Sequence, residues 1–146
     1  MEMKKQKIVM MWLRLVLGFI FLWAFFDKVF GLGFSTTVSK AWIHGGSPTA
    51  GFLSFATKGP FVDIFHALAG VVVVDWMFML GLLFVGLSLM LNKFVKLGCI
   101  AGSLMLFFMY LSLLFPANNP IIDEHIVYIL VLILIALKSG EGKQRN

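Results

Sequence analysis

The sequence predicts an all-α polytopic membrane protein: a bundle of four membrane-spanning helices with short extracytoplasmic helices in its first long connection. Four apolar runs fill most of the chain, and nearly all charged residues stand between them. The runs cover residues 8–26, 71–91, 94–115 and 121–137. Each run can supply the roughly 17–25 apolar residues with which a helix crosses the hydrocarbon of a bilayer. Inside lipid the backbone must satisfy its own hydrogen bonds, so such runs form helices.

The composition agrees with this class. The 146 residues are 60% hydrophobic and 13% charged, whereas a soluble domain carries about 25% charged residues. No polar stretch is long enough to bury a core of its own, so we expect one domain over residues 1–138 and a disordered cytoplasmic tail over residues 139–146. Cys99 is the only cysteine, which excludes an intrachain disulfide and a thiolate metal cluster.

The basic residues set the expected orientation of the chain. Eight of the twelve Lys and Arg lie in the two tails and in the turn after the second run: Lys4, Lys5, Lys7, Lys93, Lys96, Lys138, Lys143 and Arg145. With four spans these regions share one side of the membrane, and the positive-inside bias makes that side the cytoplasm. The formal net charge of +5 is therefore a topology signal and no sign of nucleic-acid binding. The first run lacks a small-x-small cleavage site, so we expect a retained first span.

Arg14 lies within the first span, and Lys28, just after it, continues the same helical face. Helical spacing places five residues on this face: Arg14, Gly18, Phe21, Phe25 and Lys28. At about 1.5 Å per residue, Arg14 and Lys28 lie about 21 Å apart along the axis. One is therefore expected near the inner membrane surface and the other near the outer surface.

The connection over residues 31–60 is expected on the extracytoplasmic side. Thr49 could cap a short apolar helix over residues 50–56, which is too apolar for a free loop and is expected on the outer leaflet. A turn of four residues precedes it: His44, Gly45, Gly46 and Ser47. Its backbone N–H groups could bind an anion, although a plain turn is the more common outcome of such a sequence.

The helical pattern from residue 61 to residue 91 is interrupted only by Gly70. A continuous helix of this length would be about 46 Å long, so its first part is expected outside the hydrocarbon, with Asp75 near the outer boundary. Gly98 and Gly102 form a GxxxG pattern in the third run, which we expect to serve packing within the bundle.

Eight titratable side chains are expected near one level, at the outer ends of the spans: Asp27, Lys28, Asp63, His66, Asp75, Asp123, Glu124 and His125. Ionisable groups at membrane depth are costly and mark candidate sites. They could instead be solvated anchors and helix caps, which we prefer for Asp27 and Asp123. His66, Glu124 and His125 are the candidate catalytic residues, because imidazole beside carboxylates transfers protons near neutral pH. No HxxH or HExxH spacing supports a metal site.

Four sequence patterns stand out in combination. They are Leu13-Arg14-Leu15 with Gly18, Phe21-Leu22-Trp23 and Asp27-Lys28; Gly46-Ser47-Pro48-Thr49-Ala50-Gly51-Phe52-Leu53; Val74-Asp75-Trp76 with Gly81; and Asn119-Pro120 with Asp123-Glu124-His125. Together they cover nearly the full chain and resemble the DoxX/DoxD-like membrane proteins, which are related to the membrane subunit of thiosulfate:quinone oxidoreductase. The resemblance implies a four-helix bundle in a bacterial or archaeal cytoplasmic membrane, sometimes within a redox complex. The family brings no settled set of catalytic residues.

We therefore expect a membrane subunit of a quinone-linked oxidoreductase, of the thiosulfate:quinone type. Quinone would be a diffusible substrate that enters from the outer leaflet, and no covalent cofactor is expected. The expected substrate-binding residues are Lys28, Asp63, Asp75, Tyr128, Phe21 and Phe25. The aromatic rings would supply apolar contacts, Lys28 and His66 would hydrogen-bond the quinone carbonyls, and Glu124 with His125 would relay protons. The expected partners are the lipid bilayer, a redox subunit and further copies of the chain.

Two other functions remain open. The small size and the absence of cofactor motifs favour a non-enzymatic anchor or assembly partner for a redox protein. A transporter of small solutes or anions ranks third, because the two halves of the chain show no clear internal repeat.

Overall fold

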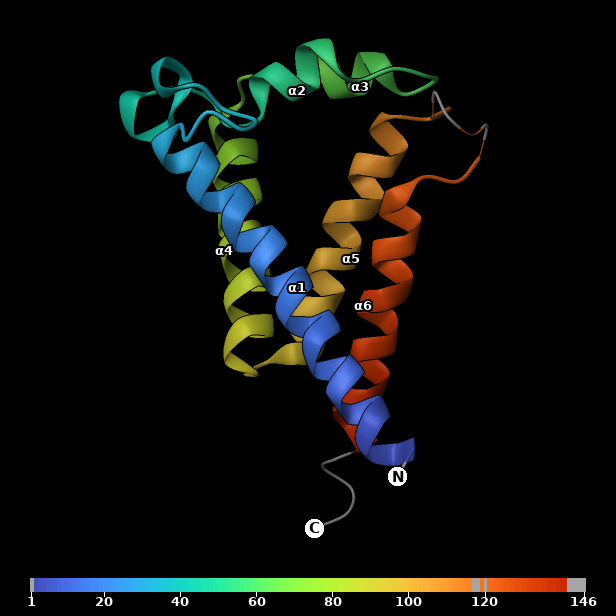
Figure 1. The fold of residues 1–146 in the computed structure, drawn as a ribbon. Helices are drawn as coiled ribbons and strands as arrows, with labels where there is room; N and C mark the ends of the chain where they lie inside the picture. Colours follow the sequence, from blue (N-terminus) through green and yellow to red (C-terminus); the bar gives the residue numbers. More distant parts are fainter. Residues whose placement is uncertain (1, 117–118, 120, 142–146) are drawn as a thin grey trace.

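The computed structural model describes residues 2–116, 119 and 121–141, and every regular element in this part of the chain is a helix. Four long helices run between the two ends of the molecule (Figure 1): α1 (Glu2–Phe30), α4 (Val72–Leu91), α5 (Val95–Ser112) and α6 (Glu124–Glu141). Three of them, α1, α4 and α5, are long and apolar enough to cross a membrane. The prediction of an all-helical chain with membrane-spanning helices is thus confirmed, while a crossing by α6 stays a prediction.

The long helices form two packed pairs. Helix α1 packs along α4, α5 packs along α6, and α4 joins the pairs through its contact with α5. Figure 1 shows the pairs close together at the end where α1 begins and α6 ends, and spread apart at the opposite end. Because the pairs diverge, the bundle has a gap at one end that other residues must fill.

Glycines allow the helices to approach closely. A Cβ on Gly86 of α4 would lie 3.0 Å from the backbone nitrogen of Leu22 in α1. The predicted GxxxG serves the same purpose within the chain, since a Cβ on Gly98 would meet Ser88 of α4 at 2.7 Å, and one on Gly102 would meet Leu132 of α6 at 3.0 Å. Small residues at such contacts increase dispersion contact between apolar helices.

Short helices lie at the spread end of the bundle. They are η1 (Val38–Lys40), η2 (Trp42–His44), α2 (Ala50–Phe55) and α3 (Val62–Ala67). We call the last two, with the residues that join them, the roof; they lie across the gap between the helix pairs (Figure 1). The helical pattern expected over residues 61–91 is broken at Gly70, whose φ of +76° separates α3 from α4.

The other end of the molecule carries the basic residues. The lysines at the start of α1, in the α4–α5 turn and late in α6 all lie near the ends of helices there (Figure 1): Lys4, Lys5, Lys7, Lys93, Lys96 and Lys138. The three basic regions therefore share one side of the molecule, as the sequence predicts. Helix α6 continues through Glu141, into the tail expected from residue 139, and residues 142–146 lie outside the described part of the chain.

Single-cysteine labelling tests the predicted orientation. Cys99 is 1% exposed, so the wild-type chain should give a low background with a membrane-impermeant maleimide. Phe55 in the roof is 89% exposed, and Phe55→Cys should be labelled on intact bacterial cells. Lys93→Cys, in the α4–α5 turn, should be labelled only after the membrane is permeabilised. Labelling of both variants on intact cells would contradict the topology.

Candidate functional site

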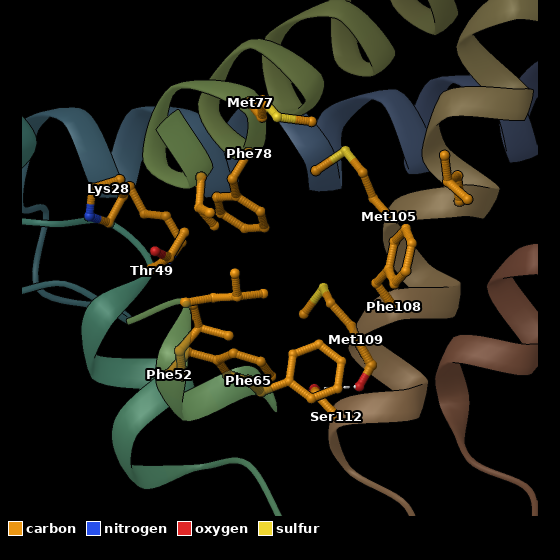
Figure 2. A pocket seen from close by; sticks show the side chains of 15 residues that line it. Lys28, Thr49, Phe52, Phe65, Met77, Phe78, Met105, Phe108, Met109 and Ser112 are labelled. Atoms are coloured by element: carbon orange, nitrogen blue, oxygen red, sulfur yellow. Dashed lines mark hydrogen bonds between the residues drawn. The ribbon is translucent and has the colours of Figure 1, made fainter. Parts of the chain in front are cut away.

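A cavity of about 390 Å³ lies beneath the roof, between α4 and α5. Figure 2 shows its side chains converging from both sides and from the roof. Helix α4 contributes Val74, Met77 and Phe78, and α5 contributes Leu104, Met105, Phe108, Met109 and Ser112. The roof and the residues on either side of it contribute Pro48, Thr49, Phe52, Leu53, Phe65 and Leu68, and α1 contributes Lys28. The cavity thus occupies the space that the diverging helix pairs leave open.

One side of the cavity opens between α4 and α5. Three of its lining residues are among the exposed apolar side chains of these helices: Met77 is 70% exposed, Leu104 is 54% exposed and Phe108 is 51% exposed. Both helices are apolar enough to span a membrane, so their exposed faces would contact lipid. A ligand can therefore reach the cavity sideways, from the apolar part of a bilayer.

Only three polar side chains line the cavity: Lys28, Thr49 and Ser112. The hydroxyl hydrogens of the latter two are already in use, since Ser112 Oγ donates to the Met109 carbonyl at 2.7 Å and Thr49 Oγ1 donates to Asp75 Oδ1 at 2.5 Å. Lys28 is half-buried, and its Nζ lies 5.9 Å from the centre of the Phe78 ring, within cation–π range. No carboxylate of a described residue forms an ion pair with it.

Asp27, the carboxylate next to Lys28 in sequence, has a structural role. It is 1% exposed and accepts hydrogen bonds from Phe34 N at 3.1 Å and from Ser35 N and Oγ at 2.9 and 2.6 Å. These bonds close the loop that follows α1. The structural role preferred from the sequence fits this arrangement, but Asp27 is buried and bonds a loop, so it is neither a solvated anchor nor a helix cap.

Asp75 ties the roof to α4. Its Oδ1 accepts three hydrogen bonds, from Ser47 Oγ at 2.8 Å, from Thr49 Oγ1 and from Thr49 N at 3.3 Å. Ser47 Oγ in turn accepts from Ala50 N at 3.0 Å. The prediction that Thr49 caps α2 is therefore wrong: Ser47 satisfies the first N–H of that helix, because the Thr49 hydroxyl is held by Asp75. Asp75 itself stands behind Thr49 and does not line the cavity.

The predicted catalytic residues lie outside the lining of the cavity. His66 is exposed on α3, Glu124 is exposed at the start of α6, and His125 is buried with its Nδ1 2.8 Å from Asp123 Oδ2. None of the three lines the cavity. Within the described residues, no group of three or more His, Cys, Asp or Glu side chains is placed to hold a metal ion. The His125–Asp123 pair is local to the first turn of α6.

The other predicted substrate-binding residues also lie elsewhere, with one exception. Phe21 is buried in the hydrophobic core, Phe25 and Tyr128 pack against that core, and Asp63 is exposed on α3. The three aromatic side chains point into the bundle, where apolar packing occupies them. Lys28 alone combines the predicted role with a position in the cavity.

The predicted anion-binding turn is closed by its own hydrogen bonds. His44 N and Gly46 N donate to the Ala41 carbonyl, and Gly45 N donates to the Trp42 carbonyl. Ser47 donates its hydroxyl hydrogen to Asp75. These groups are not available to an anion, so the expectation of an anion site over residues 44–47 is not supported, and the plain turn is what forms.

Sequence reasoning missed most of the cavity. Two signals could have indicated it: residues 50–56 are too apolar for a free loop, and residues 104–109 place two Met and two Phe on one turn and a half of helix. The first segment is expected on the outer leaflet and the second only as part of the third span, because nothing in the spacing shows that the helix pairs diverge.

Comparison of the chain with protein-family models, with curated proteins and with solved structures finds no match. The resemblance to the DoxX/DoxD-like proteins stays an expectation.

Replacement of Asp75 tests whether its hydrogen bonds hold the roof. Asp75→Ala removes an acceptor shared by three donors, and we expect the free energy of unfolding to fall by roughly 2–4 kcal/mol. In Asp75→Asn the amide oxygen can take the position of Oδ1, so most of the stability should remain. Thermal unfolding in detergent measures both variants.

Asp63→Ala is the matched control, since Asp63 is exposed and an exposed substitution usually changes stability by less than about 0.5 kcal/mol. If Asp75→Asn lost as much stability as Asp75→Ala, the hydrogen bonds to Oδ1 would not be what holds the roof.

Proposed function

We propose that the chain is the quinone-binding membrane subunit of an oxidoreductase, and that the cavity beneath the roof holds the quinone ring. The observation that carries the proposal is an apolar cavity that has exposed apolar side chains of α4 and α5 in its lining and is also lined by Lys28, whose amino group has hydrogens free to donate. A quinone has the matching chemistry: a flat ring, carbonyl oxygens that accept hydrogen bonds, and an apolar tail.

The size and the lining suit a ring of this kind. The cavity of about 390 Å³ falls within the range of roughly 300–1,000 Å³ that is typical of small-molecule sites. Phe52, Phe65 and Phe78 offer faces and edges for aromatic contact. Met105 and Met109 add flexible thioethers, which adapt to irregular ligand shapes.

The mouth between α4 and α5 suits the tail. The exposed Met77, Leu104 and Phe108 would meet lipid, so a long isoprenoid chain could remain in the bilayer while the ring is bound. The ligand would then be delivered by lateral diffusion in the membrane. On the predicted topology, with α6 as the fourth span and both termini cytoplasmic, the cavity lies in the outer leaflet.

Lys28 would fix the ring through one carbonyl. An ammonium that donates to a neutral acceptor forms a charge-assisted hydrogen bond, which is stronger than a bond between two neutral groups. The cost of placing the cation beside apolar side chains is offset in part by the Phe78 ring.

In this function the chain binds and orients the quinone, and a partner subunit delivers the electrons. Thiosulfate as the electron donor is what the sequence resemblance implies. His66, Glu124 and His125 have no part in the proposed site, because none of them lines the cavity.

Titration with a decyl-tailed quinone analogue in nanodiscs tests the proposal, with quenching of tryptophan fluorescence as the readout. We expect saturable binding to the wild-type chain and binding weaker by about ten- to a hundredfold to Lys28→Met, since a charge-assisted hydrogen bond contributes roughly 1.5–3 kcal/mol. Lys58→Met removes an exposed lysine outside the cavity and should bind like the wild type.

Absence of saturable binding, with and without a copurified partner, would refute the proposal. Equal competition by a phospholipid that carries no quinone would assign the cavity to a structural lipid instead.

A further inference from the structure

We infer that the cavity binds the reduced, hydroxyl-bearing form of its quinone more tightly than the oxidised form, and that Thr49 makes the distinction. The inference rests on the proposed function and adds to it the redox form that the site selects. It follows from which hydrogens the polar groups of the cavity have left to donate.

Thr49 can only accept a hydrogen bond from a ligand. Its hydroxyl hydrogen is donated to Asp75 Oδ1 at 2.5 Å. Three donors converge on that one oxygen: the Ser47 hydroxyl, the Thr49 hydroxyl and the Thr49 N–H. Asp75 is 5% exposed, so water does not readily replace these bonds. The Thr49 hydroxyl therefore has lone pairs, but no hydrogen, left for a ligand in the cavity.

Ser112 is limited in the same way. Its hydroxyl hydrogen is donated to the Met109 carbonyl within α5, at 2.7 Å, and this bond is drawn in Figure 2. The two hydroxyl groups of the cavity are thus both acceptors, and Lys28 is the only side chain of the lining that donates. An arrangement of one donor and two acceptors is poorly suited to a ligand that has acceptors alone.

The two forms of a quinone differ in this respect. Figure 2 shows the Lys28 amine and the Thr49 hydroxyl at the same end of the cavity. A ligand hydroxyl there can accept from Lys28 and donate to Thr49, whereas a ligand carbonyl can only accept from Lys28 and leaves the Thr49 lone pairs facing its own. The reduced form therefore makes one more hydrogen bond than the oxidised form.

Asp75 acts through Thr49 and is a positioning residue in this scheme. It does not touch the ligand, but it fixes the direction of the Thr49 hydroxyl. Tighter binding of the reduced form would make the bound quinone a stronger electron acceptor than the free one, by about 30 mV for each factor of ten in a two-electron couple. The site would accordingly serve reactions in which quinone is the oxidant.

Parallel titrations with the oxidised and the reduced decyl-quinone, the latter under anaerobic conditions, test the inference. For the wild-type chain we expect the dissociation constant of the reduced form to be about five- to tenfold lower. Thr49→Val should weaken binding of the reduced form by that factor and leave the oxidised form nearly unchanged. Thr49→Ser restores the hydroxyl and should restore the preference, and Asp75→Asn should keep it because the amide oxygen can still accept from Thr49.

The ratio of the two affinities is the deciding readout, because a fall in the amount of folded protein does not change it. Equal affinities for the two forms in the wild type would overturn the inference while leaving the proposed function in place. An equal loss of affinity for both forms in Thr49→Val would also overturn the inference and leave the proposed function in place. It would show that Thr49 only shapes the loop. Failure of both forms to bind the wild type would instead refute the proposed function itself.

Discussion

A gap between two pairs of helices can persist in the interior of a protein only if something holds the covering residues over it. Here the Asp75 carboxylate of α4 accepts from Ser47 and Thr49 before α2, and after α2 the N–H of Lys58 donates to the carbonyl of Ser112 in α5 at 2.9 Å. The roof is thus fastened to both helix pairs. A lost tie would let the roof move or the pairs close, and either change would remove the cavity.

Hydrogen bonds to the carboxylates explain why buried acidic side chains are tolerated at this end of the bundle. Asp27 and Asp75 are almost fully buried, yet each accepts three hydrogen bonds from nearby N–H and O–H groups. A buried carboxylate that is satisfied in this way loses much of its desolvation cost. Lys28 differs from both, because it has an aromatic ring beside it and no carboxylate bonded to it. That contrast separates the structural charges from the one that a ligand can use.

The sequence was sufficient for the helices and insufficient for the cavity. Long apolar runs specify helices because the backbone has no alternative in lipid, and Lys28 could be placed near an outer end by counting residues along α1. The role of Thr49 could not be found in this way. Its local sequence favours a helix cap, and the competing acceptor, Asp75, lies 26 residues away. Gly70 is similar, since glycine within a helical pattern is often tolerated and its φ of +76° arises from the path between α3 and α4.

The sequence also did not show which titratable residues line the cavity, for a related reason. Counting residues along the spans places His66, Glu124 and His125 at one depth in the membrane. Equal depth alone does not bring side chains together, because the faces of the helices decide which residues meet. Those faces gather Phe, Met and Leu beneath the roof, with a single lysine and two hydroxyl groups whose hydrogens are already donated. Chemistry in such a site depends less on many ionisable groups than on the direction of a few hydrogen bonds, because an apolar surrounding leaves each of them without competition from water.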